Sequence, residues 1–189
     1  MTNETENLGT RFRIDASRSD FTVQAFAEGL LSFMGHNPTF AVRRYGGEVQ
    51  FAADNTEVDS MLLLAQADTL SVLDRVSEKD KAEIENTMRG DVLETARYPE
   101  VVFVSKDISM KKIAEGRYRV QIIGELSLHG ITRRHSIAAE AEINGEAIRA
   151  VGEFALRLSD YNIKPVKALG GTLKVRDEVE FYFDILAQV

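Results

Sequence analysis

Apolar and polar positions alternate with a period of two along most of the chain. Between residues 118 and 128 the apolar side chains occupy alternate positions, and after a break at 129–132 the alternation resumes from Ile137 to Ile143. A period of two is typical of a strand with one buried face. Gly130 lies in the break, where its tolerance of positive φ suits a reversal. We therefore predict an antiparallel hairpin here, with Gly124 on its apolar face.

The same alternation recurs in shorter segments on both sides of this hairpin. Gly46-Gly47 and Asn144-Gly145 favour tight reversals between strands, and Asn-Gly is the stronger signal. Short connections favour antiparallel pairing, because parallel strands need long crossovers. Closure into a barrel removes the exposed edges of such a sheet. We predict an all-β chain forming an antiparallel barrel of about eight strands, with strands near residues 11–15, 21–25, 40–42, 49–51, 60–67, 101–105, 118–128, 137–143, 148–158 and 175–185.

Residues 77–90 interrupt this pattern and predict one short helix. Ser77 is a suitable N-cap, and Gly90 is a suitable stop. The apolar stripe of this segment is thin, and its other side chains are mostly charged or polar. We therefore expect the helix to lie on the outer face of the sheet.

The length and the terminal pattern predict one domain. A chain of 189 residues suffices for a single large barrel, which we place at residues 11–189. Residues 1–10 lack periodicity and are expected to be a flexible tail. The N-terminal segment also lacks the basic and apolar regions of a secretory signal, so we expect a cytoplasmic protein. No apolar run reaches the roughly 18 residues that a membrane-spanning helix needs.

Charge and motif content argue against several function classes. The 30 acidic and 23 basic residues give a net charge of −7, which disfavours a nucleic-acid surface. The three histidines lack metal-site spacing, and the chain has no cysteine. G-x-S-x-G, P-loop and G-x-G-x-x-G motifs are also absent from the sequence. We predict no metal, no cofactor and no catalytic residue, with His36 or His129 as the base if the protein is nevertheless an enzyme.

The interior positions of the predicted strands combine large and small side chains. Aromatic rings alone would fill a barrel of this size, whereas Gly124, Gly152 and alanines on the same faces leave room for a cavity or taper the barrel. The residue types alone favour a barrel interior filled by side chains over one that contains a cavity. If a cavity is present, the predicted ligand-binding residues are Phe21, Val23, Phe40, Phe51, Phe103, Ile122, Leu126, Phe154, Phe181 and Phe183.

Five stretches together resemble the YceI family: FTV at 21–23, GHNP at 35–38, TARYPEVVFVS at 95–105, GELSLHGITRRHSI at 124–137 and LSDYNI at 158–163. Residues 124–133 match the most specific motif of that family, G-x-L-x-(L/I)-H-G-(V/I)-T-(R/K), and the resemblance spans roughly residues 11–187. It implies a lipocalin-like antiparallel barrel with a helix and an apolar pocket. It also implies a polyisoprenoid or another long amphiphile, such as a fatty-acid-like lipid, as the ligand. Many family members are exported, and this chain resembles a form without a signal peptide.

An anionic headgroup on such a ligand would need a basic partner at the mouth of the pocket. Loop positions make Arg133, Arg134, Lys164 and Lys167 the candidates. The leading hypothesis is binding, transport or storage of a long hydrophobic ligand. The alternatives are an enzyme acting on a lipid-like substrate, and a filled barrel that serves as a protein interaction module and possibly forms a homodimer.

Overall fold

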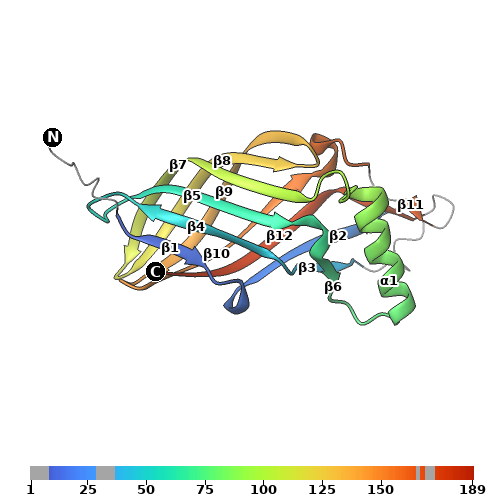
Figure 1. Cartoon of the computed structure of the whole chain (residues 1–189), viewed down its shortest axis with the longest axis horizontal. Coiled ribbons are helices and arrows are strands. Elements are labelled where there is room, and N and C mark those ends of the chain that lie inside the picture. The colour runs from blue at the N-terminus through green and yellow to red at the C-terminus, as the bar shows by residue number, and fades with distance from the viewer. Residues whose placement is uncertain (1–8, 29–36, 165–166, 169–172) are drawn as a thin grey trace, which may run out of the picture.

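The computed structural model describes residues 9–28, 37–164, 167–168 and 173–189, and it shows an antiparallel β-barrel (Figure 1). The strands in this part of the chain are β1 (Arg11–Ile14), β2 (Asp20–Glu28), β3 (Thr39–Val42), β4 (Tyr45–Phe51), β5 (Val58–Gln66), β6 (Leu70–Val72), β7 (Glu100–Ala114), β8 (Arg117–Leu128), β9 (Ile131–Ile143), β10 (Ala147–Arg157), β11 (Lys167–Ala168) and β12 (Leu173–Gln188). The helical segments are η1 (Ala16–Arg18), η3 (Ala67–Thr69), α1 (Glu78–Thr87), the π-helical turn η4 (Met88–Val92) and η5 (Leu158–Tyr161).

The wall closes because β12 pairs with both halves of one bent N-terminal strand. β1 pairs with the end of β12, and β2 pairs with the rest of it, with η1 forming the bend between the two halves. The ring continues from β1 through β4, β5, β7, β8, β9 and β10 back to β12. β3 and β6 extend the sheet from β2. The prediction of an antiparallel barrel of eight wall strands with a helix is confirmed.

The two predicted glycine-containing reversals have different outcomes. The turn at Asn144-Gly145 joins β9 to β10, and the Asn144 side-chain oxygen accepts from the amides of Glu146 and Ala147. Gly46 and Gly47 instead lie inside β4, so the predicted hairpin there is wrong. A side chain on Gly47 would collide with the carbonyl of Leu62 on β5, and glycine therefore permits a close strand approach at this position.

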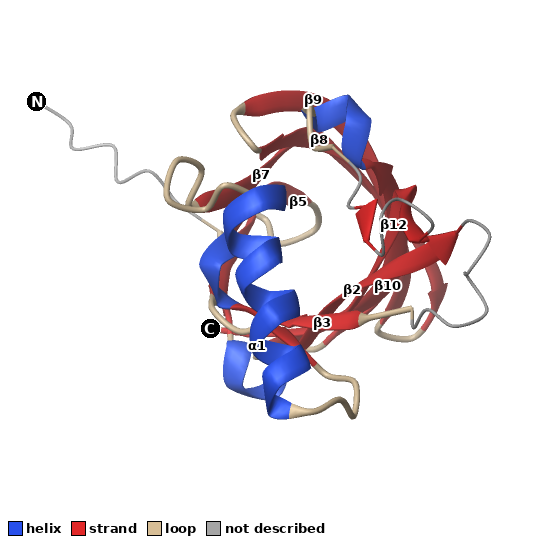
Figure 2. Ribbon diagram, turned by 90° about the vertical axis from the view of Figure 1, so that its right-hand side faces the viewer, coloured by secondary structure: helices blue, strands red, loops and turns tan. Residues whose placement is uncertain are grey.

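The predicted helix begins after the predicted N-cap residue, but it does not lie on the part of the barrel where we expected it. Ser77 is the N-cap of α1, and its hydroxyl accepts from the Asp80 amide over 3.1 Å. The helix covers one end of the barrel rather than the outer face of the sheet (Figure 2), and Ile84 and Met88 face the interior. Its thin apolar stripe therefore packs over the barrel opening. Within the described residues, none of the helices combines the length and apolar character needed to cross a bilayer.

The opposite end of the barrel is closed by four buried apolar residues, Phe12, Phe51, Ile148 and Ala187, here called the closing cluster. The Phe12 and Phe51 rings lie 5.5 Å apart at 60°. The strand ends that carry this cluster lie near the C-terminus, away from α1 (Figure 1). The barrel thus has one end closed by apolar packing and one end covered by a helix.

Candidate functional site

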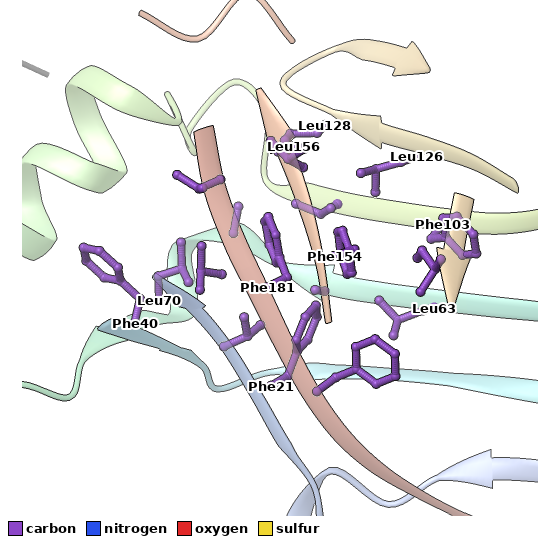
Figure 3. Close-up of a pocket in the computed structure, with 18 of the residues that line it drawn as sticks. Phe21, Phe40, Leu63, Leu70, Phe103, Leu126, Leu128, Phe154, Leu156 and Phe181 are labelled. Carbon is purple, nitrogen blue, oxygen red and sulfur yellow. The ribbon is translucent and has the colours of Figure 1, made fainter. Parts of the chain in front are cut away.

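A cavity of about 760 Å³ occupies the interior of the barrel. Its wall is almost entirely apolar and receives side chains from each wall strand, from α1 and from the β3–β6 extension. Figure 3 shows aromatic and leucine side chains that converge on this space from several strands. The volume falls within the range of about 300–1,000 Å³ that is typical of small-molecule sites. The filled interior favoured by the residues alone is therefore not what the structure contains.

Aromatic rings occupy the middle of the cavity wall without filling the space. Phe154 and Phe181 stack in parallel, with centroids 4.6 Å apart and an interplanar angle of 2°, and the Phe21 ring lies 6.2 Å from Phe181. Small side chains line the cavity on the same and neighbouring strands and leave space beside these rings. The lining alanines are Ala25, Ala27, Ala65, Ala67, Ala139, Ala141, Ala150 and Ala187.

The two interior glycines make room for aromatic rings. A Cβ on Gly124 would lie 2.5 Å from the Phe103 ring, and a Cβ on Gly152 would lie 2.5 Å from the Phe183 ring. These glycines therefore accommodate protein side chains that come from neighbouring strands. β7 also carries a register shift between Ser105 and Asp107 beside Gly124, which is where a bend is expected in a closed sheet. The alanine positions, and not the glycines, border the open volume.

The structure brings most of the predicted ligand-binding residues together. Those lining the cavity are Phe21, Val23, Phe40, Phe103, Ile122, Leu126, Phe154, Phe181 and Phe183. Phe51 does not line it, because its ring packs against Phe12 in the part of the closing cluster that lies beyond the cavity. It is the last residue of β4 and follows a register shift after Gln50. Alternation identified its inward face but carried no information on its depth along the barrel.

Several lining residues lie outside that predicted set. Leu63 and Ala65 belong to β5, whose nearly continuous apolar run hid which positions point inward. Ile84 and Met88 come from the helix that we expected on the outer surface. The apolar stripe of this helix is too thin for packing on the face of a sheet. That thinness is the sequence signal by which a helix that covers the barrel opening could have been recognised.

The polar residues that line the cavity gather at the helix-covered end. They are Asp74, Asp80, Glu83, Thr87 and Lys174. An Asp74 carboxylate oxygen accepts from the Thr39 amide over 2.7 Å. The Asp80 carboxylate accepts from the Ser77 hydroxyl, also over 2.7 Å. We refer to Asp74, Asp80, Glu83, Thr87 and Lys174 as the cavity mouth.

The predicted headgroup residues lie away from this mouth. Arg133 and Arg134 border a separate shallow recess where β9 and β10 part, since these two strands pair only as far as Ala138 and Glu153. The Arg133 Nε donates to the Asp160 carbonyl over 3.1 Å. Lys164 is exposed beyond η5 and does not line the cavity, while the Lys167 side chain falls outside what the structure describes. A basic headgroup site from these four residues is therefore not assembled among the described side chains.

His135 lies between this recess and the cavity. Its ring meets the edge of Phe154 at a centroid distance of 5.3 Å. Burial lowers the pKa of His135 below its usual value, so the ring is neutral at pH 7. It therefore adds no positive charge beside Arg133 and Arg134 at neutral pH.

His129 is buried and forms a connection between three chain segments. Its Nδ1 lies 3.1 Å from the Tyr161 carbonyl oxygen, and its Nε2 lies 2.9 Å from a Glu94 carboxylate oxygen. A carbonyl oxygen can only accept a hydrogen bond, so Nδ1 donates to the Tyr161 carbonyl. A second proton lies between Nε2 and the Glu94 carboxylate and forms the other hydrogen bond. The Tyr98 ring packs on the imidazole at 4.4 Å, and both His129 and Glu94 have positive φ. We call His129, Glu94 and the Tyr161 carbonyl the histidine bridge.

The histidine bridge does not resemble a catalytic base. His129 is not among the residues that line the cavity, and both of its ring nitrogens already have partners. Its two hydrogen bonds orient the β8–β9 turn. His36, the other candidate base, lies outside the described residues. Within the described ranges, no three histidine or carboxylate side chains come close enough to bind a metal together.

The sequence is similar to a known domain and to several bacterial proteins. A family model described as the YceI-like domain matches residues 12–187. A UPF0312 protein of Vibrio parahaemolyticus is 28% identical over 119 residues, covering 60% of this chain and 59% of that protein. A UPF0312 protein of Pseudomonas putida is 26% identical over 167 residues, covering 82% and 80%. The chain spans less than two thirds of the curated relatives that it first matches. Neither named protein carries an enzyme name.

Solved structures share the fold at low sequence identity. BcnA of Burkholderia cenocepacia superimposes with a TM-score of 0.69 at 17% identity, covering 93% of this chain and 99% of that one. A polyisoprenoid-binding domain from Saccharophagus degradans gives a TM-score of 0.67 at 13% identity, covering 94% and 98%. At these identities the likeness establishes the barrel architecture alone.

Proposed function

Since the chain belongs to the YceI-like domain family, we propose that its barrel binds, transports or stores a long-chain hydrophobic ligand of the polyisoprenoid or fatty-acid type. The observation that carries this proposal is the cavity of about 760 Å³ with its nearly continuous apolar wall. The solved polyisoprenoid-binding domain of Saccharophagus degradans, which has the same fold, supports the ligand class. Its low identity leaves the particular ligand to experiment.

The shape of the cavity supports an elongated ligand. Lining residues run from Asp80 and Ile84 on α1 to Ile148 and Ala187 of the closing cluster, so the space follows the barrel axis. A chain that buries about a dozen CH₂ groups would gain about 10 kcal/mol, at about 0.8 kcal/mol per group. Association costs about 4–15 kcal/mol in lost freedom. A long flexible chain is therefore bound only if much of its length enters the barrel.

The polar content of the site supports a binding role over catalysis. Apart from the residues of the cavity mouth, the lining side chains are apolar, so a reacting group deep in the barrel would meet no general acid or base among the described residues. The interaction-module alternative assumed a filled barrel, and the open interior removes that reason for it. Binding without chemical change is the function that this wall supports.

Native mass spectrometry of protein purified without detergent tests the proposal directly. We expect a fraction of the protein to carry an additional lipid mass that organic extraction removes. The emptied protein should then take up geranylgeraniol or hexadecanol with a stoichiometry of one. A difference in affinity between these two alcohols separates an isoprenoid preference from a preference for any long alkyl chain. Purified protein that carries no lipid and takes up neither alcohol would contradict the proposal.

A pair of alanine substitutions places the ligand inside the barrel. Ala150 on β10 lines the cavity, whereas Ala138 on β9 faces outward and is exposed. Ala150→Phe should lower the affinity for either alcohol at least about tenfold, because the new ring occupies ligand space. Ala138→Phe should bind as the original protein does. Urea unfolding of both variants shows whether weaker binding comes from a blocked cavity or from a less stable fold. Equal binding by the two variants would mean that the ligand does not lie beside Ala150.

A further inference from the structure

The polar groups that border the cavity lie at one end and carry mainly one charge. Of the cavity-mouth residues, Asp74, Asp80 and Glu83 are carboxylates, and Lys174 is the single base among the described lining side chains. Asp74 precedes α1, Asp80 and Glu83 lie on it, and Lys174 is the second residue of β12. A ligand whose tail fills the barrel would therefore leave its head beside these four charges.

The carboxylates at the mouth keep their negative charge available to a ligand. The hydrogen bonds to Asp74 and Asp80 come from an amide and a hydroxyl, which are neutral donors. Within the described residues, none of the three acids forms an ion pair with a lysine or arginine. The neighbouring bases Arg75, Lys79 and Lys81 do not line the cavity. Among the described side chains, three acids against one base leave an excess of negative charge at the opening.

The surroundings strengthen this charge rather than screen it. An apolar wall of low polarizability lies directly below the mouth, and such walls focus the field of charges at an opening. Two amides of the first turn of α1 already have partners, because the Asp80 amide donates to the Ser77 hydroxyl and the Lys81 amide donates to the Ser77 carbonyl. The net charge of −7 adds repulsion for any approaching anion.

We infer that the cavity mouth selects ligands by charge and admits a long-chain amphiphile with a cationic or uncharged head in preference to one with a phosphate, sulfate or carboxylate head. This inference rests on the proposed binding function. It replaces the basic headgroup site expected from Arg133, Arg134, Lys164 and Lys167, of which the first three do not line the cavity and the side chain of the fourth lies outside the described residues. An amine or quaternary ammonium is the head that Asp74, Asp80 and Glu83 would attract most.

The test compares three amphiphiles with the same tail. Tetradecyltrimethylammonium, tetradecanol and tetradecyl sulfate are each used to displace a neutral fluorescent dye from the barrel, below their micelle concentrations. Circular dichroism at each concentration verifies that the protein stays folded. At low salt we expect the ammonium compound to bind at least about tenfold more tightly than the sulfate, with the alcohol between them. In about 0.5 M salt the difference should shrink, because exposed charges are screened.

Two charge reversals locate the preference at the mouth. Glu83→Lys changes a lining residue, and Glu115→Lys makes the same net charge change at the β7–β8 turn, where that side chain is 99% exposed. Glu83→Lys should abolish or reverse the preference for the ammonium head, measured in each variant as the ratio of the ammonium affinity to the sulfate affinity. Glu115→Lys should leave the order of the three amphiphiles unchanged.

The outcomes separate this inference from the function on which it rests. If the alcohol binds and the sulfate binds as tightly as the ammonium compound, the charge selection is overturned while lipid binding stands. The same holds if Glu115→Lys shifts the preference as much as Glu83→Lys does. If none of the three amphiphiles displaces the dye and no lipid co-purifies, the binding role falls and the inference falls with it.

Discussion

The two ends of the barrel are closed by different kinds of contact. At one end the closing cluster buries aromatic and aliphatic side chains, with Phe12 and Phe51 only 3% and 5% exposed. At the other end, Ile84 and Met88 pack against the main core, and polar contacts add to this packing: the Glu85 carboxylate accepts from the Val72 amide, and the Arg89 side chain donates to the carbonyls of Asp68 and Leu70. The first end is therefore closed by apolar packing between wall strands, and the second by a helix that combines apolar packing with polar attachments.

This difference indicates which end opens. The closing cluster opens only when wall strands separate, whereas a short helix across an opening can move while the wall strands stay paired. Among the described residues, the polar side chains that line the cavity also lie at the helix-covered end. A ligand should therefore enter and leave beside α1. Three substitutions, taken from the largest expected effect to the smallest, test whether the ends differ in this way.

Removal of the Phe51 ring should have the largest effect on the free energy of unfolding. Phe51→Ala leaves a void against Phe12 and Ile148, and the expected loss is about 3–5 kcal/mol. Urea denaturation measures it, with Tyr182→Ala, an exposed aromatic of β12, as the matched control that loses less than about 1 kcal/mol. A loss for Phe51→Ala no larger than that of the control would show that the closing cluster is not a structural core.

Disruption of the histidine bridge should cost less overall. His129→Ala removes both hydrogen bonds and places alanine at a φ of 51°, so we expect a loss of about 2–3 kcal/mol. His129→Asn tolerates that φ better and should recover part of the loss. Urea denaturation gives both values, and hydrogen exchange should show faster opening of the β8–β9 turn and of residues 94–98. Exchange that increases instead across the strands of the closing cluster would contradict a local role for the bridge.

Loss of the helix cap should have the smallest effect on stability and a clear effect on the mouth. Ser77→Ala is expected to cost about 1 kcal/mol. The consequence should appear as faster hydrogen exchange in α1 and faster release of a bound tetradecanol, since this helix covers the opening. Ser109→Ala, at an exposed position of β7, is the control. Unchanged release from the Ser77 variant would mean that ligands pass by a route that does not involve α1.

Much of the barrel follows from the sequence, because strand faces are encoded locally. Alternation placed Phe103, Phe154 and Phe181 on interior faces, and the Asn144-Gly145 turn set the β9–β10 hairpin. The depth of a residue along the barrel axis, in contrast, is not encoded by its neighbours in the sequence. Phe51 shares the inward face of the lining residues yet lies in the closing cluster, since its position depends on how β1 and β12 pair across the whole chain.

The mouth was harder to predict for the same reason. Asp74 and Lys174 are 100 positions apart in the sequence, and only barrel closure brings them to one opening. The cap at Ser77 could be predicted from its own neighbours, but the place where the helix docks could not. Gly152 was expected to border open space, and the ring of Phe183 from the adjacent strand occupies that space instead. Local signals therefore fixed elements, while the site required their long-range arrangement.

Among the described residues, the closing cluster packs across one end of the cavity and α1 lies across the other, which is the arrangement of a container and not of a conduit. A chain that entered tail first beside α1 would stop when its end met Phe12 and Phe51, and any excess length would stay outside. The barrel would thus measure its cargo against a fixed depth. Because the head never passes through the protein, it stays within reach of whatever delivers or collects it, and loading and unloading follow the same path in opposite directions.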